Sequence, residues 1–130
     1  RLKEFIQAGL VDYIAMDIKA GKAKYPRVVG LGIDLKQIEQ TIQLVSEFGY
    51  YEFRTTIVPE IHDTFEILDI AKWLNEVCGE KPLRFVLQGF KNNGKFIDGR
   101  YSKKQNTPET TLNEMKQAVK DYFWDVEIRN

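Results

Sequence analysis

The chain has 130 residues, the length of one domain, and 43% apolar and 29% charged residues are typical of a globular protein. Its 19 basic residues balance 19 acidic ones, and no apolar run approaches the ~20 residues of a membrane span, so we expect neither a nucleic-acid nor a membrane partner. The single cysteine, Cys78, excludes an intrachain disulfide and is typical of a protein of the reducing cytoplasm.

The first third of the chain predicts a helix end, a strand and a capped helix. Residues 2–9 have the pattern of the last turns of a helix closed by glycine, so we expect the chain to be cut from a longer protein. Residues 11–19 form a strand-like run, and a loop rich in glycine follows. A helix then begins after Asp34, with Gln37 placed as in a capping box, and ends at Gly49.

The middle of the chain predicts a second strand and a second capped helix. The strand covers residues 51–58 and stops at Pro59, which cannot continue a sheet ladder. Asp63 and Glu66 form a second cap-and-box pair. The helix after them carries its apolar residues on one stripe, and Cys78 belongs to that stripe as a small core residue.

The last third predicts a strand over residues 83–88, a helix, and a short closing strand over residues 126–128. Thr107 caps this helix and Pro108 takes its first position. Residues 91–104 mix basic and aromatic side chains, and with no net positive charge we expect a solvated loop rather than a nucleic-acid site. Strands that alternate with helices predict an α/β fold with a mostly parallel sheet. Periodicity alone does not distinguish an open sheet from part of a barrel.

Each predicted strand has one apolar face and one polar face, because successive side chains point to opposite sides. The polar faces carry Asp17 and Lys19 in the first strand, Glu52, Arg54 and Thr56 in the second, and Arg84 and Gln88 in the third. Lone buried charges cost several kcal/mol, so they need partners. Two interpretations stay open: a ligand pocket at the carboxyl ends of the strands, anchored by Lys19 and Arg54, or a self-paired network without a ligand.

Two runs of residues resemble a known family. Residues 10–20, Leu-Val-Asp-Tyr-Ile-Ala-Met-Asp-Ile-Lys-Ala, resemble the Asp-x-Lys strand of enzymes that activate glycyl-radical enzymes. Residues 51–59, Tyr-Glu-Phe-Arg-Thr-Thr-Ile-Val-Pro, are most similar to anaerobic ribonucleoside-triphosphate reductase activating proteins, with pyruvate formate-lyase activating enzymes as relatives. The resemblance covers the whole chain and is weakest between residues 91 and 106.

The resemblance implies that residues 1–130 are the C-terminal half of a partial (β/α)6, TIM-like radical SAM barrel. Members of this family are oxidoreductases that cleave S-adenosylmethionine at a 4Fe-4S cluster and generate a glycyl radical on a partner enzyme. For this chain the resemblance implies that the partner is anaerobic ribonucleotide reductase. Their cluster is held by a Cys-x3-Cys-x2-Cys loop, which this sequence lacks. We therefore expect no metal ligand and no catalytic residue in this fragment, and no activity from the fragment alone.

The resemblance also assigns roles to single residues. Lys19 matches the lysine that meets the carboxylate of S-adenosylmethionine, Asp17 matches its partner aspartate, and Arg54 matches an arginine that faces the cofactor. Gln88 falls where formate-lyase activators carry a Pro-Tyr-His element, and the difference favours the ribonucleotide-reductase branch. For His62, its place in the loop after the second strand leaves two alternatives: a contact with cofactor or partner, or an exposed loop histidine beside an aspartate, which is the commoner case and the one that we expect. The resemblance favours the ligand pocket; the alternative is a non-catalytic α/β interaction domain with a self-paired network.

Overall fold

The computed structural model describes residues 2–9, 12–30, 32–91 and 106–130. The strands are β1 (Ile14–Asp17), β2 (Tyr51–Ile57), β3 (Arg84–Gly89) and β4 (Asp125–Arg129). The helices are α1 (Leu2–Gln7), α2 (Tyr25–Val29), α3 (Leu35–Phe48), α4 (Thr64–Cys78) and α5 (Glu109–Val119), and a short 3-10 helix, η1 (Lys120–Tyr122), follows α5.

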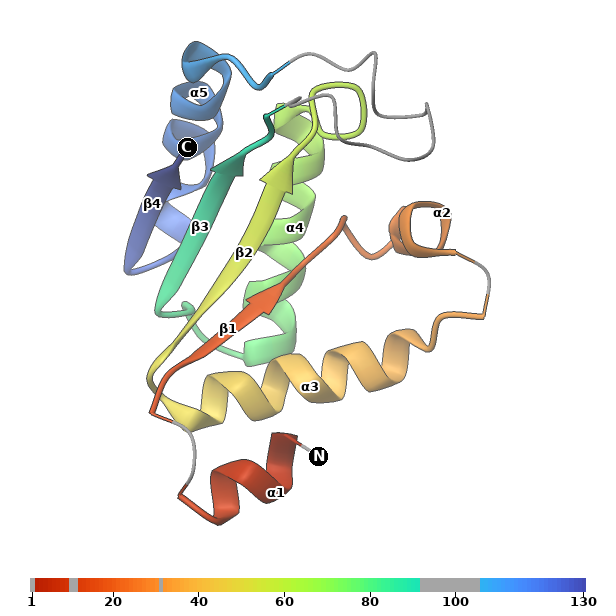
Figure 1. Cartoon of the computed structure of the whole chain (residues 1–130), viewed down its shortest axis with the longest axis vertical. Helices are drawn as coiled ribbons and strands as arrows, with labels where there is room; N and C mark the ends of the chain where they lie inside the picture. Colours follow the sequence, from red (N-terminus) through yellow and green to blue (C-terminus); the bar gives the residue numbers. More distant parts are fainter. Residues whose placement is uncertain (1, 10–11, 31, 92–105) are drawn as a thin grey trace.

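The strands form one sheet in the order β1-β2-β3-β4, and each neighbouring pair is parallel. Figure 1 shows α4 and α5 behind this sheet, and α3, which crosses the view below β1, contacts α4, β1 and β2. Each strand is connected to the next through one of these helices. The predicted α/β fold, with parallel strands that alternate with helices, is therefore confirmed. Within the described part of the chain, no helix is long and apolar enough to cross a membrane.

The core lies between the sheet and these three helices. Fully buried side chains come from the strands (Phe53, Ile57, Phe85 and Leu87) and from the helices (Ile42, Ile67, Leu74, Leu112 and Met115). Each such side chain contributes roughly 1.5–3 kcal/mol relative to an exposed one. Because side chains alternate along a strand, the residues between the core positions of β2 point to the opposite face of the sheet. That second face carries the polar side chains that the sequence predicts.

Two of the predicted helix caps are present, and one of them differs in detail. Asp34 accepts a hydrogen bond from the Gln37 amide (3.4 Å) at the start of α3. Asp63 accepts one from the Glu66 amide (2.7 Å) at the start of α4. The predicted reciprocal bond from the Glu66 carboxylate to the cap is wrong, because that carboxylate binds the amide of Gly21 instead (2.7 Å).

The prediction that Thr107 caps the last helix is wrong. The N-cap of α5 is Pro108, which has no side-chain cap bond, and the helix begins at Glu109. The Thr107 hydroxyl instead donates to the carbonyl of Ile57 and accepts from the amide of Phe90 (2.8 Å). The carboxyl ends of two parallel strands leave buried backbone groups that need partners, and the hydroxyl is used there.

Two other segments differ from the sequence-based prediction. The first strand covers only Ile14–Asp17, so Lys19 lies just beyond its end rather than inside it. The loop that was expected to follow contains α2, which accommodates Pro26 in its first turn. The predicted loop over residues 91–104 lies outside the described residues except for Lys91.

Candidate functional site

A hollow of about 420 Å³ lies at the carboxyl ends of β1, β2 and β3. Its polar lining consists of Asp17, Lys19, Thr56, His62, Gln88 and Lys91, and its apolar lining includes Ile18, Val28, Val58 and Phe90. In parallel sheets, ligands bind at this edge of the strands, and cavities of roughly 300–1,000 Å³ hold small molecules. The hollow is therefore the candidate binding site of the described chain.

The structure brings three of the four predicted binding residues to this hollow. Asp17, Lys19 and Gln88 line it, and Arg54 does not. The Lys19 side chain is 55% exposed, and its Nζ lies 4.0 Å from Asp17 Oδ2, so the two form at most a weak, solvated pair. Arg54 donates from Nε to Asp17 Oδ1 at 3.2 Å. In this geometry Arg54 contacts Asp17, while Lys19 lines the hollow.

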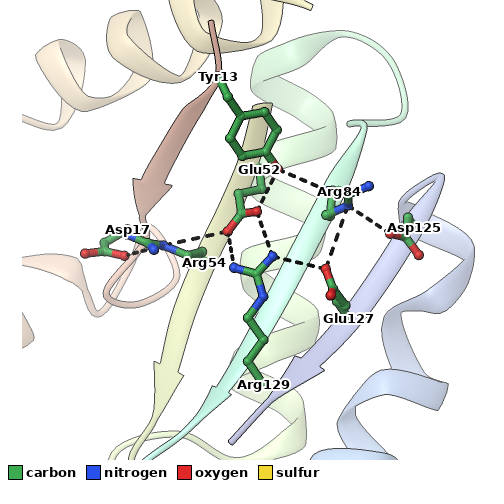
Figure 2. Close-up of polar contacts among 8 residues, drawn as sticks. All are labelled: Tyr13, Asp17, Glu52, Arg54, Arg84, Asp125, Glu127 and Arg129. Carbon is green, nitrogen blue, oxygen red and sulfur yellow. Dashed lines mark hydrogen bonds and ion pairs between the residues drawn. The ribbon is translucent and has the colours of Figure 1, made fainter. Parts of the chain in front are cut away.

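Nearer the amino ends of the strands than the hollow, the polar face of the sheet centres on the buried carboxylate of Glu52 (Figure 2). Arg129 donates to both of its oxygens, at 2.8 and 3.0 Å, and the Tyr13 hydroxyl donates at 2.6 Å. Arg54 Nε lies 3.9 Å away. Burial raises the pKa of Glu52, but the hydrogen bonds from Arg129 and Tyr13 outweigh it and hold the pKa below its ordinary value.

The same network continues to the last strand. Arg84 pairs through Nε with Asp125 (2.8 Å) and donates to the Tyr13 hydroxyl (3.2 Å), while Arg129 also pairs with Glu127 (3.1 Å). The structure thus contains the self-paired network, with members on all four strands (Figure 2). Its carboxylates, Asp17, Glu52, Asp125 and Glu127, are matched by Lys19, Arg54, Arg84 and Arg129.

Sequence reasoning missed four contributors to this network. Tyr13, Asp125, Glu127 and Arg129 were not among the candidate residues, although they lie on the polar face. The signal was the alternation itself, because Glu127 and Arg129 have the same two-residue spacing as Glu52 and Arg54. A short strand with a charge at every second position indicates a polar face as clearly as a longer one.

His62 is buried, so the expectation of an exposed loop histidine is wrong. Its Nδ1 accepts from the amide of Val58 at 3.0 Å, and its Nε2 lies 2.8 Å from the carbonyl oxygen of Lys19. The buried ring thus supplies hydrogen-bond partners for the amide that follows β2 and for the carbonyl group that follows β1. Burial lowers the pKa of His62, against the opposing effect of the carbonyl of Lys19 and the charge of Glu66.

The described residues fit the two cofactors of the resembled family to different degrees. Among them, no group of three histidine, cysteine, aspartate or glutamate residues could hold a metal ion, and burial raises the pKa of the Cys78 thiol. These residues therefore do not fit an iron–sulfur cluster. The hollow does offer an exposed ammonium, a carboxylate, an amide and a hydroxyl, which suit a zwitterionic ligand that also has hydroxyl groups.

The parallel sheet, its helices and the polar hollow at its carboxyl edge place the chain in the α/β class of proteins. No protein-family model matches the chain. Over 98% of its length it is 29% identical to a candidate glycyl-radical enzyme activating enzyme of Methanocaldococcus jannaschii, and it spans about half (53%) of that protein.

The fold is also similar to a solved structure. The crystal structure of a domain of pyruvate-formate lyase-activating enzyme from Bacteroides vulgatus superposes with a TM-score of 0.71, covering 98% of this chain and 74% of that one. The two sequences are 17% identical, so this likeness concerns the fold. In sequence and in fold, the chain is thus similar to proteins named as activating enzymes.

Proposed function

We propose that this chain is the C-terminal part of a radical SAM enzyme that activates a glycyl-radical enzyme, and that the hollow is part of its S-adenosylmethionine site. The observation that carries the proposal is the half-exposed side chain of Lys19, which is among the residues that line a ligand-sized hollow. The similarity to an activating enzyme over 98% of the chain supports it. A cytoplasmic location and anaerobic ribonucleotide reductase as the partner belong to the same proposal.

Within this proposal each residue at the hollow has a task. Lys19 binds the carboxylate of S-adenosylmethionine, and Asp17 binds its amino group. Gln88 and Thr56, which are register neighbours on β3 and β2, bind polar groups of the nucleoside. Arg54 faces the cofactor region from behind Asp17 and holds its carboxylate. The 4Fe-4S cluster supplies the reductive chemistry, and its ligands come from outside these 130 residues.

The proposal is tested by the affinity of the longer protein for S-adenosylmethionine, measured by calorimetry. Lys19→Ala should weaken binding about ten-fold or more, because a charge-assisted hydrogen bond is lost. Lys22→Ala is a matched control, since its side chain is equally exposed (55%) but pairs with Glu39 and does not line the hollow. Equal affinities of the two variants would contradict the assignment of the hollow.

A second test concerns the gene. The reading frame that encodes this chain should also encode three cysteines with the spacing Cys-x3-Cys-x2-Cys before Arg1. A frame without them would contradict a radical SAM enzyme.

The self-paired network favours a second candidate function, a non-catalytic interaction domain. The charges of the polar face already balance one another, so the fold needs no ligand to compensate them. In that case the longer protein would not bind S-adenosylmethionine, or Lys19→Ala would leave its affinity unchanged. The calorimetric experiment therefore distinguishes the two candidates.

A further inference from the structure

The backbone that follows β1 is held by side chains from other parts of the chain. The carbonyl of Ile18 accepts from the Thr55 hydroxyl at 2.8 Å, and the carbonyl of Lys19 faces Nε2 of His62 at 2.8 Å. The amide of Gly21 donates to the Glu66 carboxylate at 2.7 Å. The segment over residues 18–21 is thus fixed at three points within four residues.

The three side chains that hold this segment are themselves buried. Thr55 is 1% exposed, Glu66 3% and His62 5%. Within the described part of the chain, the buried polar residues are Glu52, Thr55, His62, Glu66 and Thr107. Buried polar groups cost free energy unless they are hydrogen-bonded, and three of these five are bonded to one short segment. That segment carries Lys19, which stands at the hollow.

The hydrogen bonds of His62 define its tautomer. Since Nδ1 accepts from the amide of Val58, it carries no proton, and the proton of the neutral ring lies on Nε2. Nε2 therefore donates to the carbonyl of Lys19. The ring connects the end of β2 to the backbone of Lys19 by one acceptor and one donor, so each connection can be removed separately.

We propose that His62 is a positioning residue of the binding site: it fixes the backbone of Lys19 so that the ammonium group meets an anionic group of the ligand. This inference rests on the proposed function, in which that anion is the carboxylate of S-adenosylmethionine. Glu66 fixes the same segment at Gly21, where an added Cβ would lie 3.2 Å from the Cβ of Asp69, so the backbone is packed closely against α4. The backbone of Lys19 is thereby held in place before the ligand arrives, which lowers the cost of binding.

Two substitutions separate the two bonds of His62. In His62→Asn, the amide oxygen takes the place of Nδ1 and can still accept from Val58, but nothing donates to the carbonyl of Lys19. In His62→Gln, the longer side chain places its amide nitrogen near the position of Nε2 and keeps the donor. Both variants are studied in the longer protein, with S-adenosylmethionine and with 5′-methylthioadenosine, which lacks the carboxylate.

If His62 positions Lys19, His62→Asn should lower the affinity for S-adenosylmethionine about ten-fold, as Lys19→Ala does. It should change the affinity for 5′-methylthioadenosine by no more than about two-fold. His62→Gln should restore the affinity for S-adenosylmethionine. The double variant Lys19→Ala with His62→Asn should bind no more weakly than Lys19→Ala alone, because both changes remove the same contact.

Other outcomes overturn the inference in distinguishable ways. If His62→Asn lowers the affinity for both ligands equally, His62 has a general structural role. If His62→Asn leaves the affinity for S-adenosylmethionine unchanged while Lys19→Ala lowers it, the two residues are not coupled. In both cases the proposed function stands. An unchanged Lys19→Ala variant would overturn the proposed function itself. If His62→Asn does not fold, His62→Gln decides: near-native affinity for both ligands supports the inference, and a selective loss of S-adenosylmethionine contradicts it.

Discussion

The guanidinium group of Arg129 binds the carboxylate of Glu52 through two hydrogen bonds, at 2.8 and 3.0 Å, across 77 residues of sequence. The Glu52 side chain is 3% exposed, whereas the arginine side chain is 38% exposed. The pair therefore joins β2 to β4 over the polar face of β3 and neutralises a charge that water barely reaches (Figure 2). Removal of the arginine leaves that charge with weaker compensation.

Arg129→Ala should lower the free energy of unfolding by about 2 kcal/mol, measured by urea denaturation. This is less than the cost of breaking a fully buried pair, because water reaches Arg129 and Tyr13 still donates to Glu52. Arg84→Ala is the control, since its partner Asp125 is half exposed, and it should cost no more than about 1 kcal/mol. An equal cost for both variants would show that the burial of Glu52 is unimportant.

The stability of the chain should fall when the pH drops below the ordinary histidine value of 6.5. Burial lowers the pKa of His62 in the folded state, so the unfolded chain binds a proton that the folded chain rejects. The loss begins at 6.5 and ends at the lower pKa of the folded state. Among neighbouring charges, Glu66 opposes this shift and Lys24 adds to it. Urea denaturation at a series of pH values should show this slope in the wild type and not in His62→Gln.

The isolated 130-residue chain should bind no iron when it is treated anaerobically with iron and sulfide. Its sequence has one cysteine, and Cys78 lies half-buried on α4 against the core, where burial raises the pKa of its thiol. The thiolate that a cluster needs is therefore disfavoured. Iron analysis and the visible absorption spectrum provide the measurement, with the longer protein as the positive control. Stoichiometric iron in the isolated chain would contradict the assignment of the cluster ligands to another segment.

Gly21→Ala should destabilise the chain by about 1–2 kcal/mol, because its Cβ would lie 3.2 Å from the Cβ of Asp69 on a rigid helix. Gly89→Ala should cost less, although its Cβ would lie nearer to another atom. That atom is Oδ1 of Asn130, at the end of an exposed side chain that can rotate away. The thermal unfolding midpoints of the two variants provide the measurement, and Gly21→Ala should have the lower midpoint because Asp69 cannot move away whereas Asn130 can.

The elements of the fold were predictable because each depends on neighbours in sequence. The spacing of apolar residues identified α3 and α4, and Asp34 and Asp63 identified where they begin. The alternation of side chains along β2 placed Glu52 and Arg54 on one face. Those conclusions need only the local periods of helix and strand.

The partners of the polar residues were not predictable in the same way. Glu52 finds Arg129 only because three strands align in register, and the sequence contains no local signal for that distance. A threonine hydroxyl can cap a helix or bind backbone groups at the ends of strands. Thr107 has the sequence context of a helix cap, but its hydroxyl binds the backbone beyond the end of β3. His62 is similar, since a loop histidine has no period that indicates burial. Lys19 was a candidate from the sequence, whereas the bonds of Thr55, His62 and Glu66 to the segment that carries it are visible only in the structure.

The pairing of Phe90 with Thr107 has a consequence for how this protein can vary. The Thr107 amide donates to the carbonyl of Phe90 at 2.9 Å, and the Phe90 amide donates to the Thr107 hydroxyl, so the residue just after β3 is paired with a residue just before α5. The segment from Lys91 to Asn106 therefore begins and ends at the Phe90–Thr107 pair. Chain closure costs grow only slowly with length, so related proteins can differ greatly in the size of this insertion while the register of β2, β3 and β4 is preserved.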